Sequence, residues 1–268
     1  MSALLHVSDT HFGCERPEVV EALVAFAAAL RPRLAVLSGD ITQRARRGQF
    51  DAAARFAARL GAPVLAIPGN HDLPLFDLVS RLVRPYAGYQ RAFGADLEPV
   101  HEDADMLVVS VNTTRVYRHK HGEVSAAQVE RVASRMRACP PGKLRVVVTH
   151  QPMHVPLGRD ESNLLRGYAD AARAWAAAGA DLLLAGHIHL PFVRPVSERV
   201  AGLARALWAV NAGTAVSRRV RAGGGEHNCV NVIRYAAGEA ACRVERHEHD
   251  RAAARFQLAE ATSIPLAR

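Results

Sequence analysis

The stretch Leu4-Leu5-His6-Val7-Ser8-Asp9-Thr10-His11 places a short apolar run directly before two polar side chains that can bind a metal ion. The run at 4–7 predicts a buried strand. The same arrangement recurs further along the chain, where apolar runs at 34–37, 64–67, 144–148 and 181–185 are followed by Asp40, by Asn70 and His71, by His150, and by His187 and His189. This repetition predicts a sheet protein whose functional side chains follow its strands.

Helical patterns lie between these runs, at 17–30, 49–60, 125–138 and 163–178, and Pro17 is well placed to begin the first one. After Pro191 the pattern changes to strands at 192–196, 207–210, 230–235 and 241–245. The first two thirds of the chain is therefore predicted to be α/β and the last third to be rich in strands. We expect a single domain over 1–268, with 190–250 as a second-sheet portion and with 73–98 as a candidate helical cap.

In open α/β sheets, sites form beyond the carboxyl ends of the strands. If the predicted strands share one sheet, their loops meet at one edge. Aspartate, asparagine and histidine suit Mn, Fe or Zn, and two such ions about 3.5–4 Å apart can bind both the attacking and the leaving oxygen of a phosphoryl group. We therefore predict a two-metal hydrolytic site, in which Gly39, Gly69 and Gly186 allow sharp turns or close approach to an ion.

Five motifs occur in a fixed order: Asp-x-His at 9–11, Gly-Asp at 39–40, Gly-Asn-His-Asp at 69–72, His150, and Gly-His-x-His at 186–189. This order resembles the calcineurin-like metallophosphoesterase superfamily. The residues around the first three motifs, at 6–13, 38–42 and 68–72, are most similar to the bacterial class III cyclic-nucleotide phosphodiesterases of that superfamily. The resemblance implies a four-layer α-β-β-α sandwich with a dinuclear metal site at the carboxyl ends of the strands.

The resemblance also implies a role for each motif residue. Asp9, His11 and His189 would bind the first ion, Asn70, His150 and His187 the second, and Asp40 would bridge both. A hydroxide bridging the two ions would attack phosphorus in line. His71 would assist the leaving oxygen, and Asp72 would orient a histidine.

Asn70, His71 and His154 are the candidate substrate-binding residues, His154 because it lies four residues after His150. Related sequences often carry a second histidine directly after the position of His150. This chain has Gln151 there, which can form hydrogen bonds locally.

A phosphodiesterase acting on a small nucleotide-type substrate, such as a 3′,5′-cyclic nucleotide, is the favoured function. The alternatives within the superfamily are a nucleotide-linked lipid pyrophosphohydrolase, a phosphomonoesterase and a nuclease. Aromatic residues make up only 6% of the chain and the arginines are dispersed, which disfavours a nucleic-acid groove. A non-catalytic scaffold is disfavoured because every motif is complete.

The formal net charge of +8 favours anionic partners, such as a small phosphorylated substrate. Arg44, Arg46 and Arg47 are candidates to meet a substrate phosphate, with solvent exposure as the alternative. The segment 73–93 has three interpretations: a helix pair on the sheet edge, a cap that selects substrate, or a basic amphipathic surface that meets lipid as a peripheral contact. The helix pair and the substrate-selecting cap are favoured together. The oligomeric state is a separate question, for which the sequence leaves a homodimer as one alternative.

The four cysteines show no Cys-x-x-Cys spacing, and we expect free thiols. The sequence shows no leader pattern and no transmembrane segment, so the expected location is cytoplasmic.

Overall fold

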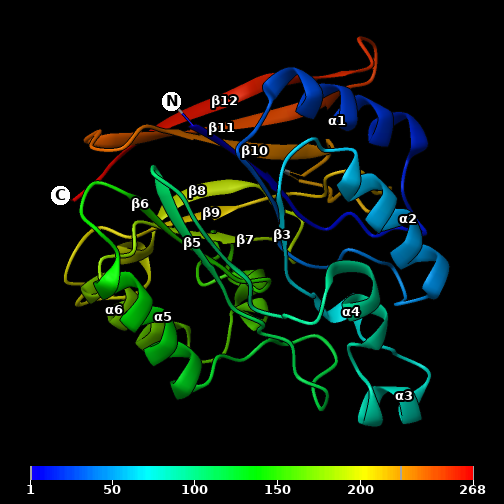
Figure 1. The fold of residues 1–268 in the computed structure, drawn as a ribbon, viewed down its shortest axis with the longest axis horizontal. Helices are drawn as coiled ribbons and strands as arrows, with labels where there is room; N and C mark the ends of the chain where they lie inside the picture. Colours follow the sequence, from blue (N-terminus) through cyan, green and yellow to red (C-terminus); the bar gives the residue numbers. More distant parts are fainter. Residues whose placement is uncertain (1, 224, 268) are drawn as a thin grey trace.

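The computed structural model describes residues 2–223 and 225–267 and contains two six-stranded sheets that lie face to face (Figure 1). The first sheet has the order β12 (Arg255–Pro265), β11 (Ala241–Asp250), β10 (Cys229–Tyr235), β1 (Ser2–Val7), β2 (Leu34–Leu37), β3 (Val64–Ala66). The second has the order β4 (Val100–Glu102), β5 (Met106–Ser110), β6 (Leu144–Val148), β7 (Leu182–Ala185), β9 (Trp208–Asn211), β8 (Phe192–Pro195).

The central strands are parallel within each sheet: β1, β2 and β3 in the first, and β5, β6, β7 and β9 in the second. Parallel strands are buried on both faces, so they read as continuous apolar runs. In β1, Leu4 points into the core between the sheets and Leu5 points to the opposite side. In β7, Leu184 points into the core between the sheets and Leu183 points to the opposite side.

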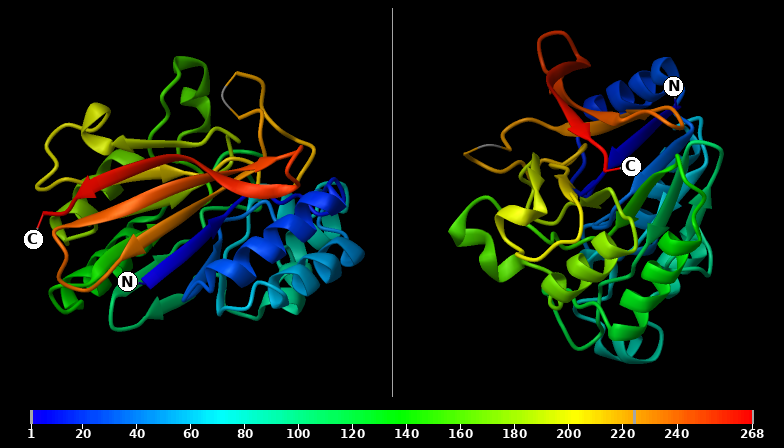
Figure 2. Two further views of the ribbon diagram at one scale, coloured as in Figure 1. Left: turned by 90° about the horizontal axis from the view of Figure 1, so that it is seen from above. Right: turned by 90° about the vertical axis from the view of Figure 1, so that its left-hand side faces the viewer.

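Helices cover the outer face of each sheet. α1 (Pro17–Leu30) and α2 (Arg47–Ala58) pack on the first sheet, with α4 (Ala87–Phe93) against α2. α5 (Ala126–Ala138) and α6 (Tyr168–Ala177) pack on the second sheet, on the opposite side of the molecule (Figures 1 and 2). The predicted four-layer α-β-β-α sandwich is therefore confirmed.

The strands that precede the motifs do not share one sheet. β1, β2 and β3 belong to one sheet and β6 and β7 to the other. The last third of the chain is also divided, because β8 and β9 complete the second sheet while β10, β11 and β12 extend the first. The expected second-sheet portion at 190–250 is thus wrong as a unit, since β10 pairs with β1 and β11 in the first sheet and not with β8 or β9.

Some elements differ from the sequence prediction. β12 was not predicted, because this edge strand is largely exposed and its apolar residues do not alternate regularly. α6 begins at Tyr168 rather than at 163, since a 3-10 turn, η2, occupies Gly158–Asn163. The segment after Asp72 forms two short helices, α3 (Leu78–Val83) and α4. Tyr89 of α4 reaches β3 at the sheet edge, as the helix-pair interpretation expected, whereas the apolar residues of α3 are exposed rather than packed there.

Cys14, Cys139 and Cys229 are free thiols, as predicted. Among the described residues, every helix is too short or too polar to cross a bilayer. The single domain over 1–268 stays a prediction.

Truncating the core between the sheets should destabilise the fold. Leu184 is fully buried there, so Leu184→Ala removes its packing and leaves a cavity. We expect the free energy of unfolding to fall by about 3–4 kcal/mol, measured by urea denaturation. The control is Leu258→Ala on β12, where the side chain is 52% exposed and the expected change is below about 0.5 kcal/mol. Equal losses in the two variants would contradict this account of the core.

Candidate metal centre

The carboxyl ends of strands from both sheets meet at one rim of the sandwich, and the predicted metal ligands lie there. Asp9 and His11 follow β1, Asp40 follows β2, Asn70 opens the 3-10 turn η1 (Asn70–Asp72) after β3, His150 follows β6, and His187 and His189 follow β7. The structure brings these seven side chains into two adjoining groups.

The first group consists of Asp9, His11 and His189. The Nε2 atoms of His11 and His189 lie 3.1 Å apart, and Nε2 of His189 lies 3.2 Å from Oδ1 of Asp9. The other carboxylate oxygen, Oδ2 of Asp9, accepts hydrogen bonds from the Ser8 hydroxyl at 2.7 Å and from the backbone N–H of His187 at 2.9 Å. These bonds hold the carboxylate so that Oδ1 faces the two rings.

The second group consists of Asp40, His150 and His187, with Asn70 beside them. Nε2 of His150 lies 3.2 Å from Oδ1 of Asp40, 3.3 Å from Oδ1 of Asn70 and 3.3 Å from Nδ1 of His187. Oδ2 of Asp40 lies 3.8 Å from Nε2 of His11 in the first group. Asp40 is therefore the carboxylate that lies between the two groups.

The hydrogen bonds of the histidines show that these groups suit cations. Nδ1 of His189 donates to the Arg219 carbonyl at 2.7 Å, and Nδ1 of His150 donates to the Ser38 carbonyl at 2.9 Å. In each neutral ring Nε2 is then an acceptor, and it faces other acceptors: Oδ1 of Asp9 or Oδ1 of Asp40. Buried acceptors that face each other are unfavourable unless a cation lies between them, and ring N–H groups held by carbonyls are the usual support of ligand histidines.

The electrostatics agree with this arrangement. Burial lowers the pKa of His11 and of His187 to about 3, which keeps both rings in the neutral form that binds metals. Burial alone would raise the pKa of the Asp40 carboxyl, but the neighbouring His150 holds it well below its usual range. Conversely, burial lowers the pKa of His150, and the charge of Asp40 outweighs that effect and raises it to about 9. The centre therefore has a strong demand for positive charge.

Five of the candidate ligands have left-handed backbone conformations. The φ angles are +52° at Asp9, +44° at His11, +47° at Asp40, +68° at His187 and +55° at His189. Only three other described non-glycine residues share this region. Side chains in this conformation are strained, and such residues concentrate at functional sites.

Asp72 does not orient a histidine, contrary to the expectation. Its carboxylate is buried and accepts hydrogen bonds from the backbone N–H groups of Ile41, Thr42 and Gly69, at 3.0, 2.7 and 2.8 Å, and from the Thr42 hydroxyl at 2.8 Å. Both oxygens are occupied by these donors. Asp72 therefore fastens the loop that carries Asp40 to the turn that carries Asn70.

His71 lies beside the first group, with its ring edge against His11 at a centroid distance of 4.9 Å. Its Nδ1 lies 3.0 Å from the Gln43 carbonyl, so Nδ1 carries the hydrogen and Nε2 faces the site. There Nε2 lies 3.2 Å from a guanidinium nitrogen of Arg219, which also donates to the Gln43 side chain at 3.1 Å. No role was predicted for Arg219, because nothing in the local sequence distinguishes it from Arg218.

His154 belongs to neither of the two groups. It pairs with Glu198 at 3.1 Å and packs beside Phe192, so the structure gives no support for substrate contact at this position. Gln151 is buried and bonds locally, as expected. Its side chain accepts from the Thr113 hydroxyl at 2.5 Å and donates to the Lys120 carbonyl at 3.1 Å. It thereby joins the segment 113–120 to the end of β6.

A hollow of about 490 Å³ opens beside His187 and His189. Its lining includes Lys120, Arg219 and Arg221, and the one carboxylate in it, Asp160, is paired with Arg221 at 2.8 Å. The hollow is therefore suited to an anionic molecule.

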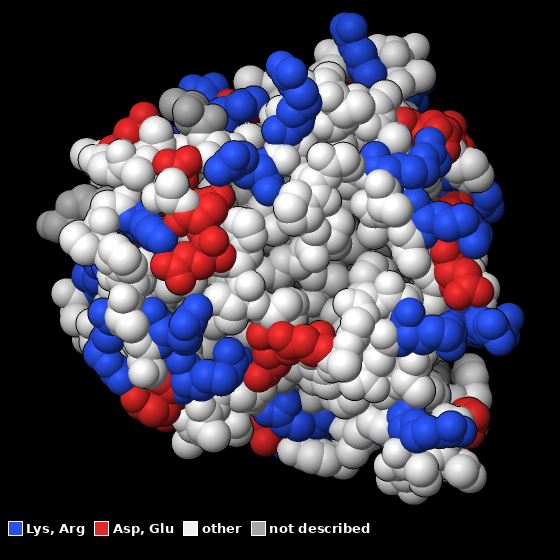
Figure 3. Space-filling view, viewed as in Figure 1, with Lys and Arg blue, Asp and Glu red and all other residues white. Residues whose placement is uncertain are grey.

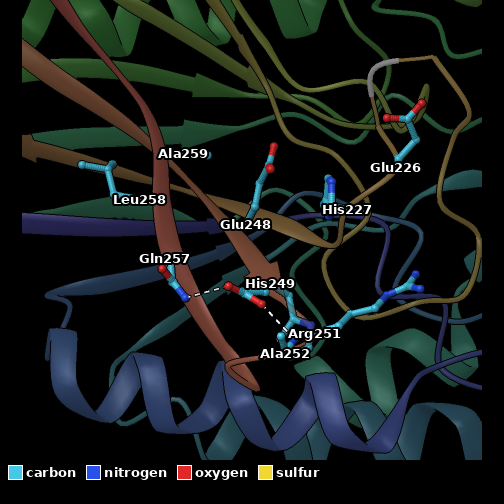
Figure 4. A pocket seen from close by; sticks show the side chains of 10 residues that line it. Glu226, His227, Glu248, His249, Arg251, Ala252, Gln257, Leu258 and Ala259 are labelled. Atoms are coloured by element: carbon cyan, nitrogen blue, oxygen red, sulfur yellow. Dashed lines mark hydrogen bonds between the residues drawn. The ribbon is translucent and has the colours of Figure 1, made fainter.

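Another hollow, of about 580 Å³, lies between β11, β12 and the segment at 226–227 (Figure 4). Its Asp250 carboxylate is occupied by Gln257 and by the backbone N–H of Ala252. None of the candidate ligands lines this hollow, so we do not assign it to the metal centre.

Comparison with known proteins agrees with the geometry. Residues 3–191 match the family model described as Calcineurin-like phosphoesterase, and the chain belongs to this family. The match covers the five motifs and ends two residues after His189.

Two bacterial relatives are similar over 203 residues. The chain is 29% identical to a cAMP/cGMP dual specificity phosphodiesterase of Mycobacterium tuberculosis, over 69% of this chain and 61% of that protein. It is 25% identical to the 3′,5′-cyclic adenosine monophosphate phosphodiesterase CpdA of Escherichia coli, over 69% of each. The matched region thus spans less than two thirds of the mycobacterial protein.

Solved structures share the fold. A purple acid phosphatase from yellow lupin superposes with a TM-score of 0.73 at 11% identity, over 98% of this chain and 53% of that chain. Vacuolar protein sorting 29 from Cryptosporidium parvum superposes with a TM-score of 0.53 at 11% identity, over 98% of each chain.

The close approach of two loops at Gly186 provides a test of the centre. A Cβ atom at this position would lie 1.9 Å from the Ser8 hydroxyl and 2.3 Å from Oδ2 of Asp9. We expect Gly186→Ala to push Asp9 out of place and to raise the Kd for the metal by at least about tenfold, or roughly 1.4 kcal/mol, measured by elemental analysis after dialysis at several metal concentrations. Gly48→Ala is the control, because a Cβ there meets nothing within 4 Å. Equal metal content in the two variants would contradict the placement of Asp9 in the centre.

Proposed function

We propose that this protein is a metal-dependent phosphodiesterase that hydrolyses a small nucleotide-type substrate such as a 3′,5′-cyclic nucleotide. The observation that carries the proposal is the pair of buried groups in which histidine acceptors face carboxylate acceptors. The proposed ligands are Asp9, His11 and His189 for one ion, Asn70, His150 and His187 for the other, and Asp40 for both.

Two bound ions would supply positive charge at the phosphoryl oxygens and a water molecule acidified enough to attack near neutral pH. The chain itself fixes the geometry of the centre. The Ser38 and Arg219 carbonyls hold the rings of His150 and His189, and the Ser8 hydroxyl helps to hold Asp9. Asp72 keeps the loops of Asp40 and Asn70 together, so it acts as a positioning residue. These contacts keep the donor set in place before substrate arrives.

His71 and Arg219 are placed to handle the substrate. The bond from Nδ1 to the Gln43 carbonyl leaves Nε2 of His71 facing the site, where a proton held on Nε2 can be given to the leaving oxygen. Arg219 donates to this Nε2 when no substrate is present. We propose that the guanidinium turns to a phosphate oxygen when substrate binds, because a charge-assisted bond to phosphate is stronger than a bond to a neutral ring. Arg219 is thus assigned to substrate binding and His71 to the leaving group.

Two observations support a small diester substrate. The hollow beside the ligands measures about 490 Å³, within the range of small-molecule sites, and its cationic lining suits a phosphate. The two bacterial relatives are named as phosphodiesterases of cyclic nucleotides. Mn, Fe and Zn all suit the donor set, and elemental analysis of the purified protein identifies which is bound.

Metal removal and replacement test the reaction class. We expect chelated protein to lose hydrolysis of bis(p-nitrophenyl) phosphate and of 3′,5′-cyclic AMP, and added Mn²⁺ to restore both. His71→Ala should lower kcat by about 10²–10⁴-fold while the metal content stays the same. Activity confined to p-nitrophenyl phosphate would replace this proposal by a phosphomonoesterase. Restored protein that cleaves bis(p-nitrophenyl) phosphate but not cyclic AMP would keep the diesterase and exclude that nucleotide.

The role of Arg219 is tested against its neighbour. Arg219→Ala should lower kcat/KM for the diester by about 10–100-fold, the loss expected for one charge-assisted hydrogen bond of about 1.5–3 kcal/mol. Metal content should not change, because it is the backbone carbonyl of Arg219 that bonds to His189. Arg218→Ala is the matched control, since the Arg218 side chain is exposed. Equal kcat/KM values for the two variants would remove Arg219 from the substrate site.

A further inference from the structure

The helix α3 carries an apolar surface that no other part of the described chain covers. Its members are Phe76, just before the helix, and Leu78, Val79, Leu82 and Val83 within it, and they are 66–81% exposed. We name these five residues the docking face. Single exposed apolar residues are ordinary, but a contiguous group of this kind marks an interaction site.

The orientation of α3 is fixed by a charged residue rather than by apolar packing. The buried side chain of the helix is Arg81, which donates to the backbone carbonyls of Pro74, Val116 and Arg118 at 2.9, 2.8 and 2.7 Å. At 3.6 residues per turn, the four apolar residues of the helix share an arc of about 140°, away from Arg81. The anchoring of Arg81 therefore keeps the docking face turned outward.

Basic residues border the docking face. A hollow of about 550 Å³ lies beside Phe76, and the one acidic residue in its lining is Asp77. Five arginines also line it: Arg44, Arg46, Arg47, Arg84 and Arg91. All five are exposed, and Arg44 lies over the Phe76 ring at 5.6 Å. In Figure 3 the corner where Figure 1 shows α3 is mainly uncharged, with Lys or Arg side chains and a smaller acidic group next to it.

We propose that the docking face binds the surface of an anionic lipid bilayer. Its apolar side chains would enter the boundary between headgroups and acyl chains, while the bordering arginines contact lipid phosphates. Charge selects this occupant over a second copy of the chain. Asp51 pairs with Arg47 and Arg91, at 3.9 and 3.6 Å, and offsets only part of the positive charge of the five arginines. A symmetric dimer across the same face would bring two such basic borders together, and like charges across an interface oppose association.

The proposal does not rest on the proposed reaction, but it places the metal centre near the membrane. The docking face begins four residues after Asp72, and Arg81 fastens α3 to the segment at 116–118, two residues before Lys120 in the cationic hollow. A bilayer bound at the docking face would therefore fix the position of the segment that carries Lys120 into the wall of the cationic hollow.

Vesicle sedimentation tests the docking face. Wild-type protein should sediment with vesicles of phosphatidylglycerol and phosphatidylcholine and remain in solution with vesicles of phosphatidylcholine alone. Replacing Val79 and Leu82 together by Glu should lower the partition coefficient by at least about tenfold. Leu258→Glu, which places the same charge on an exposed apolar position of β12 (Figure 4), should bind like the wild type. Unchanged hydrolysis of bis(p-nitrophenyl) phosphate without vesicles shows that each variant is folded.

The arginine border is tested separately. Arg46→Ala and Arg84→Ala should each weaken binding to the anionic vesicles by about fivefold, and 0.5 M salt should weaken it further. Arg173→Ala on α6, remote from the docking face, is the control. Wild-type protein that stays in solution with anionic vesicles, or binds neutral vesicles equally, overturns the proposal. The proposal is also overturned if light scattering shows that the wild-type protein is a dimer and that replacing Val79 and Leu82 together by Glu makes it monomeric.

Discussion

The apolar contact between the two sheets is the constraint on which the metal centre depends. Leu4, Val36 and Leu65 of one sheet pack against Val146 and Leu184 of the other. This contact brings the carboxyl ends of both sets of parallel strands to one rim. Asp9, Asp40 and Asn70 come from the first sheet, and the histidines at 150, 187 and 189 from the second. The centre is therefore an interface between sheets, and its ligands stay together only while the two sheets keep their packing.

The sequence predicted the positions of the ligands because each follows an apolar run, and such runs mark strands buried on both faces. It could not predict how those strands divide between two sheets, since periodicity records burial and not strand neighbours. The role of Asp72 was missed for a related reason. Its partners are backbone N–H groups of Ile41 and Thr42, which have no signature in the sequence. Arg219 was missed because only the fold brings it to His71.

Positive charge is distributed unevenly over the molecule, and its placement links the centre to the docking face. Arg219 and Lys120 line the hollow beside the ligands, and a second set of arginines surrounds the apolar face of α3. Arg81 of α3 links the two places, because it donates to the backbone carbonyls of Val116 and Arg118, just before Lys120 in the sequence. An anionic substrate and an anionic surface would thus approach the same side of the protein, where the field that attracts one also attracts the other.

The left-handed backbone lowers the stability of the folded chain in the absence of metal; it occurs at Asp9, His11, Asp40, His187 and His189. Each such residue costs about 1 kcal/mol or more relative to an ordinary conformation. Bound ions favour the folded state and offset this cost, because the unfolded chain has no preformed site for them. Scarcity of metal should therefore reduce the amount of the protein as well as its turnover number, since proteases remove the unfolded fraction. The abundance of this chain would then follow the metal supply without any dedicated sensor.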